Sequence, residues 1–86
     1  MKTANLIVSK CYFDRKNGYR LGDRLFSATF GSVEEAMKRA ADCCLPGVAV
    51  TVRPNYNEKD ERGRFFREWR SFNGGALEEI RFPRSF

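Results

Sequence analysis

Arginine and aromatic residues are interleaved most densely in the segment 64–72, which reads RFFREWRSF. On one face of a strand, aromatic rings can stack the bases of a single-stranded nucleic acid while guanidinium groups hold its phosphates. The same residue types are prominent in the hot spots of protein–protein interfaces. A third interpretation is that they cover the back of a sheet or form a homodimer contact. The candidate binding residues are Arg53, Arg62, Arg64, Phe66, Arg70 and Phe72.

Residue types that support catalysis are scarce, and we predict that the protein is not an enzyme. The chain has no histidine, so the usual general base near neutral pH is missing. Cys11, Cys43 and Cys44 have no neighbouring base in the sequence that would activate a nucleophile. The three cysteines are an odd number, so we expect free thiols in a reducing compartment. They also lack a Cys-x-x-Cys pattern, and we expect no metal and no cofactor.

The composition is that of one globular domain spanning residues 1–86. The net charge of +5 favours acidic partners, either nucleic acid or an acidic protein surface, although a charge of this size also suits the solubility of a small domain. Near the N-terminus only Leu6, Ile7 and Val8 form an apolar run, which is too short for a signal peptide. No segment is apolar enough to span a membrane, so we expect a cytoplasmic protein.

One segment, residues 32–44, has the pattern of an amphipathic helix. Ser32 and Glu35 have the spacing of a capping box at its start. Pro46 and Gly47 are expected to stop it, because proline cannot continue the hydrogen-bond ladder and glycine tolerates a positive φ. The apolar residues at helical spacing are Val33, Ala36, Met37, Ala40 and Cys44.

Two strands are predicted before this helix, at residues 5–13 and 19–30. Asn17 and Gly18 between them favour a hairpin, because both residues tolerate a positive φ. Gly22-Asp23 predicts a bulge or bend in the second strand. Phe26 and Phe30 alternate with polar residues, and we expect their face to point toward the core.

Three strands are predicted after the helix, at residues 48–53, 64–72 and 76–82. The fold class is therefore α+β, with the order β-β-α-β-β-β and an antiparallel or mixed sheet that carries one helix on one face. One helix cannot cover both sides of five strands, so we expect the other face to be open to water or to a partner.

The register between the third and fourth predicted strands decides which side chains lie on the helix side. Opposite residues in an antiparallel pair have numbers with a constant sum, and an even sum would bury charged residues, Glu68 among them, beside the core valines. An odd sum places Trp69 opposite Val52 on the helix side. It also places Arg53 opposite Glu68 on the outer face, a favourable charge pair, and we predict this register. Arg67 would then point inward and reach water at the helix-free end.

A predicted hairpin is followed by the helical segment GSVEEAMKRA (31–40) and then by the segment CCLPGV (43–48), which precedes a strand. This layout resembles small phage-encoded inhibitors, in particular anti-CRISPR proteins with one helix on an antiparallel sheet. Small phage inhibitors of bacterial RNA polymerase look similar in this part. The resemblance, over residues 25–57, implies a non-enzymatic inhibitor or adaptor, encoded by a phage or mobile element, that binds a host nucleoprotein complex such as a CRISPR effector in the host cytoplasm. The alternative function is a basic nucleic-acid-binding module that uses the arginine and aromatic face. A monomer and a homodimer are both left open.

Overall fold

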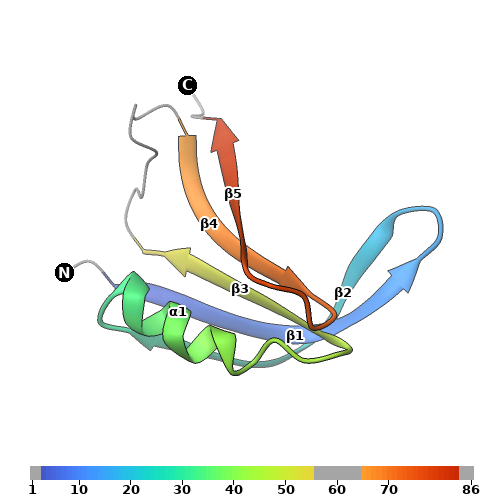
Figure 1. The fold of residues 1–86 in the computed structure, drawn as a ribbon, viewed down its shortest axis with the longest axis horizontal. Helices are drawn as coiled ribbons and strands as arrows, with labels where there is room; N and C mark the ends of the chain where they lie inside the picture. The colour runs from blue at the N-terminus through green and yellow to red at the C-terminus, as the bar shows by residue number, and fades with distance from the viewer. Residues whose placement is uncertain (1–2, 56–64, 84–86) are drawn as a thin grey trace.

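A computed structural model describes residues 3–55 and 65–83, which form one open sheet of five strands and a single helix. The strands follow the order β2-β1-β3-β4-β5 in the sheet, and every neighbouring pair is antiparallel (Figure 1). The predicted α+β class and the predicted order of elements are confirmed. The elements are β1 (Ala4–Asp14), β2 (Gly18–Phe30), α1 (Val33–Ala41), β3 (Val48–Pro54), β4 (Phe65–Phe72) and β5 (Glu78–Pro83).

The helix α1 begins as predicted but ends earlier. The Ser32 hydroxyl accepts a hydrogen bond from the Glu35 amide at 3.1 Å, which satisfies one of the free donors of the first turn. At the other end, the Cys43 amide donates to the carbonyl of Ala40 at 2.9 Å, three residues back instead of four. This tightening ends α1 at Ala41, so the predicted extension to Cys44 is wrong.

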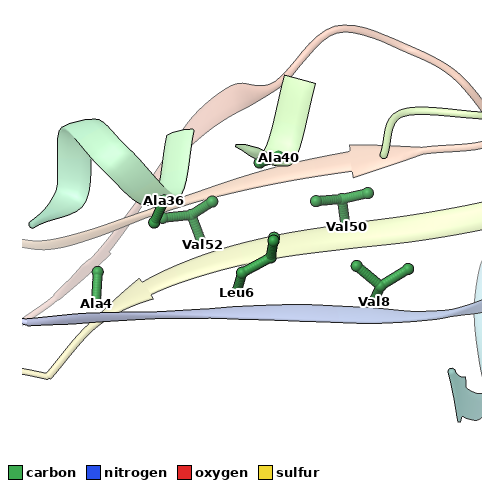
Figure 2. Packing of buried hydrophobic residues seen from close by; sticks show 7 residues of the cluster. All are labelled: Ala4, Leu6, Val8, Ala36, Ala40, Val50 and Val52. Atoms are coloured by element: carbon green, nitrogen blue, oxygen red, sulfur yellow. The ribbon is translucent and has the colours of Figure 1, made fainter. Parts of the chain in front are cut away.

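The core lies between α1 and the strands β1 and β3. Leu6 and Val8 from β1 lie beside Val52 and Val50 from β3 (Figure 2). The helix contributes two buried alanines, whose small side chains allow it to lie close to the sheet, while Val33 and Met37 pack against the edge of the cluster. The residues of this cluster are Ala4, Leu6, Val8, Ala36, Ala40, Val50 and Val52.

The helix is too short to cover the strands beneath it. At 1.5 Å per residue its nine residues span about 14 Å, whereas the eleven residues of β1 extend for about 37 Å. Phe30 on β2 packs against the core as expected. Phe26 lies on the predicted face, opposite Val8, but it stays exposed. Alternation sets the face of a side chain, but the length of the covering helix decides whether that face is buried.

Past the core, β1 and β2 continue as a two-stranded ribbon. β1 pairs with β3 only as far as Lys10, so we call residues 11–22, the part of the β1–β2 hairpin beyond this point, the hairpin arm. The β1–β2 register shifts twice, which confirms the predicted irregularity at Gly22-Asp23 and adds one at Leu25. Figure 1 shows the arm projecting from the rest of the sheet.

The predicted register of β3 and β4 is confirmed. Val52 lies opposite Trp69, a pair whose numbers have an odd sum. Trp69 is half-buried and packs against the edge of the core, while α1 lies over β1, β2 and β3. Arg67 also lies on this side; its guanidinium covers the Trp69 ring at 5.2 Å and its Nε is 2.6 Å from a carboxylate oxygen of Glu79. The sequence interpretation did not foresee this partner on β5.

Candidate functional site

The sheet face away from α1 carries the predicted binding residues that the structure describes. The ladder places Arg53, Arg70 and Phe72 together on this face, on β3 and β4. Strand alternation assigns the Phe66 backbone position to the same face, opposite Phe82. The Phe66 side chain lies outside the described residues, as do Arg62 and Arg64.

This face is less open than predicted, because Glu68 at its centre is buried, with 5% of its surface exposed. A buried carboxylate is costly unless it is paired. Glu68 accepts a hydrogen bond from Arg53 Nε at 3.1 Å and another from Arg70 on its second oxygen. The predicted Arg53–Glu68 pair is therefore confirmed, whereas the burial of Glu68 on this face does not follow from the register. Part of the donor capacity of both arginines is used inside the protein.

A row of aromatic rings joins this face to the hairpin arm. The ring of Tyr19 on β2 stacks on Phe72 on β4, with centroids 5.7 Å apart and an angle of 7° between the rings. Tyr19 also meets Phe13 of β1 edge to face, at 5.4 Å. Two strands separate β2 from β4 in the sheet, so this stack requires the arm to lean over the sheet face. The contact also helps to explain why Ala49, opposite Phe72 in the ladder, is buried.

The outer part of this row remains at the surface. Phe13 keeps 65% of its surface exposed, Tyr19 45% and Leu21 58%. These residues are close together, because Phe13 pairs with Tyr19 in the ladder and Leu21 continues the same face of β2. The sequence interpretation did not predict this exposed apolar surface. Their positions beside the Asn17-Gly18 turn were the available signal, since a hairpin turn places its flanking residues in cross-strand pairs.

The tip of the arm is a well-defined basic turn. Asp14 accepts hydrogen bonds from the Lys16 amide at 2.9 Å and from Asn17 Nδ2 at 3.1 Å, and Arg20 lies 3.5 Å away. These contacts, chiefly the Lys16 amide, lower the pKa of Asp14 and favour its ionised form. Gly18 completes the turn with a φ of +76°. The arm carries three basic residues, Arg15, Lys16 and Arg20, against the single acidic residue Asp14.

The three cysteines lie in the part of the chain that the structure describes. The thiols of Cys11, Cys43 and Cys44 are free, as expected, and each cysteine is half-buried. Cys44 Sγ donates to the carbonyl of Ala40 at 3.2 Å, which suits a small packing residue. No group of three or more histidine, cysteine, aspartate or glutamate side chains within residues 3–55 and 65–83 could hold a metal ion.

The fold defines the class of protein: an α+β protein with one short helix on an antiparallel sheet of five strands, two of which extend as a hairpin arm. In the part of the chain that the structure describes, no helix has the length and apolar character needed to cross a membrane. Comparisons with protein-family models, with curated proteins and with solved structures find no match for this chain.

Proposed function

We propose that the protein is a non-catalytic binding protein, an inhibitor or adaptor that acts by stoichiometric contact with a host nucleoprotein complex. The observation that carries this proposal is the hairpin arm, where Phe13, Tyr19 and Leu21 expose large apolar side chains on one face. Contiguous apolar surface of this kind on a small protein is typical of an interaction site. Exposed aromatic rings are also common anchors of protein interfaces.

The chemistry of the arm selects the kind of partner surface. Its apolar rings require an apolar groove, and its excess of basic over acidic residues favours acidic residues around that groove. The turn held by Asp14 pre-forms the tip, which lowers the entropy lost on binding. A CRISPR effector is the first complex to test, because the strand-helix-strand segment at residues 25–57 resembles that of anti-CRISPR proteins. A phage or mobile-element origin belongs to the same proposal.

The test measures affinity for purified CRISPR effector ribonucleoproteins by biolayer interferometry, using the wild type, Phe13→Ala and Leu45→Ala. Leu45 is a matched control, because it is also a large exposed apolar residue but lies outside the arm. We expect Phe13→Ala to weaken binding by at least about tenfold, the effect of losing an interface anchor. Leu45→Ala should stay within about twofold of the wild type, as for a residue outside the interface.

Three results would count against this proposal. No binding of the wild type to effector complexes would reject that class of partner. Equal losses in Phe13→Ala and Leu45→Ala would show that the arm does not carry the contact. A wild-type homodimer in solution that Phe13→Ala converts to a monomer would assign the exposed rings to a second copy of the chain.

A further inference from the structure

A polar groove lies on the face away from α1, beside β1. Arg24 from β2 and Arg53 from β3 line it from opposite sides of β1, with Ile7 between them. The lining contains no acidic side chain. Its polar members are Asn5, Arg24, Ser27, Thr29 and Arg53.

The groove has a surplus of hydrogen-bond donors. Arg24 forms no ion pair within the described residues, and Arg53 uses its Nε for Glu68 while 56% of its side chain remains exposed. The Asn5 Oδ1 atom accepts hydrogen bonds from Thr29 Oγ1 at 2.8 Å and from Asn55 Nδ2 at 3.1 Å. These two bonds fix the orientation of the Asn5 amide and leave its Nδ2 as a donor. Glu68 binds Arg53 Nε, but no carboxylate lines the groove itself, and the remaining donors and positive charge suit an anionic ligand.

The groove is connected to the aromatic row by the sheet itself. Arg24 lies opposite Ser9, Ser9 opposite Ala49, and Ala49 opposite Phe72, so these residues form one row across four strands. The two middle members are small and buried. At the usual spacing of strands the row is about 14 Å long, with a cation at one end and a ring at the other.

We propose that this groove binds the phosphate backbone of a single-stranded nucleic acid, with Arg24 and Arg53 as the phosphate ligands and the Phe72–Tyr19 rings stacking a neighbouring base. The planar guanidinium matches a phosphate with two parallel hydrogen bonds. Rings beside a basic groove are the usual platform for unpaired bases, and the two features share one face here. This inference goes beyond the proposed protein contact of the arm, because it assigns a second ligand to the groove. Tyr19 belongs to both surfaces, whereas Phe13 belongs to the arm alone.

The experiment measures fluorescence anisotropy of labelled single-stranded RNA and DNA of about twelve nucleotides, a length within the range bound by one small domain. The proteins are the wild type, Arg24→Ala and Arg39→Ala, each checked by circular dichroism. Arg39 is the matched control, since it is an exposed arginine on α1, on the other side of the sheet. We expect Arg24→Ala to weaken binding about tenfold and to reduce the slope of log affinity against log salt by about 1. Arg39→Ala should lose clearly less affinity than Arg24→Ala.

Equal effects of Arg24→Ala and Arg39→Ala would overturn the groove as the site. A poly-glutamate peptide can be added as a competitor of the labelled oligonucleotide. If it displaces the label as effectively as unlabelled oligonucleotide does, the nucleic-acid assignment is overturned in favour of an acidic protein segment. No binding of the wild type to either oligonucleotide would also reject it. None of these results bears on the effector test, which depends on Phe13 in the arm, so the two proposals fail separately.

Discussion

The two ends of the β1–β2 pair have a similar sequence pattern but different surroundings. Near its start, β1 buries Leu6 and Val8 under α1, whereas near its end Tyr12 and Phe13 are exposed. Each end of β1 carries three consecutive apolar residues, Leu6-Ile7-Val8 at the start and Cys11-Tyr12-Phe13 at the end. Tyr12 is exposed because β3 stops pairing with β1 at Lys10 and the short helix does not reach the arm. Phe13 lies on the opposite face, the one away from α1, where it meets Tyr19. The same two strands therefore form part of the core at one end and a candidate binding surface at the other.

Two irregularities mark the change between these ends. The register shifts around Leu25 and Gly22-Asp23 lie between the covered part of β2 and the arm. Extra residues in one strand increase its local twist and bend. We infer that this bend brings Tyr19 over Phe72, which a flat sheet would keep two strands apart. The arm is thus oriented by backbone irregularity and by one stacked pair of rings.

The largest difference between the two ends should appear on truncating a leucine in each. Leu6→Ala should lower the free energy of unfolding by about 2–5 kcal/mol, because Leu6 is fully buried and its loss leaves a cavity. Leu21→Ala in the arm should change it by less than about 0.5 kcal/mol, as for an ordinary surface substitution. Urea titration of both variants measures this contrast. Similar losses at the two positions would mean that the arm is part of the cooperative core.

The second prediction concerns the outer face of β3 and β4. Glu68→Gln should lower the free energy of unfolding by about 1–3 kcal/mol, because it removes the charge that holds two guanidinium groups. Asp23→Asn, a loss of an exposed carboxylate near the arm, is the control and should have little effect. Equal stabilities of Glu68→Gln and the wild type would show that this paired network contributes nothing to the fold.

The third prediction tests the helix that provides the cover. Ser32→Ala should lower the free energy of unfolding by about 1 kcal/mol, since the Glu35 amide loses its hydrogen-bond acceptor. Ser32→Asp retains an acceptor and should keep most of the stability. Thermal unfolding followed by circular dichroism measures the stability of both variants against the wild type. Equal losses in both variants would indicate that the hydroxyl is not acting as a cap.

The smallest effect is the pH dependence of the arm. The pKa of Asp14 lies below its usual 3.8, so the ionised form stabilises the folded turn. This contribution is present above the unfolded pKa and is lost as the pH falls through the folded pKa. An NMR titration that follows the Lys16 amide should therefore give a midpoint below 3.8. Asp14→Asn is the control and should remove this transition of the Lys16 amide. A midpoint at or above 3.8 in the wild type would contradict the hydrogen bonding described for the turn.

Much of the fold follows from local patterns in the sequence. The Ser32 cap, the Asn17-Gly18 turn and the odd register of β3 and β4 each depend on a few neighbouring residues or on the cost of burying charge. The order of the strands in the sheet does not follow from such patterns, because it depends on long-range pairing. The early end of α1 was missed because the last turn tightens before Pro46 is reached.

The candidate site was less predictable than the fold. Placing Arg53 and Arg70 on one face was within reach of the register argument. Two further contacts depend on the bend of the sheet in three dimensions. Glu68 accepts hydrogen bonds from both arginines, and Tyr19 stacks on Phe72. Alternation identifies a face, but it contains no information on which part of that face another element covers.

Amide hydrogen exchange in the free protein tests whether β1 and β2 belong to the cooperative core at one end only. We predict that amides of residues 4–9 exchange only through global unfolding, while those of residues 12–14 and 18–21 exchange at least about 100-fold faster through local opening of the arm. Equal protection along the whole length of both strands would instead show that the arm is as much a part of the folded core as the strands beneath α1.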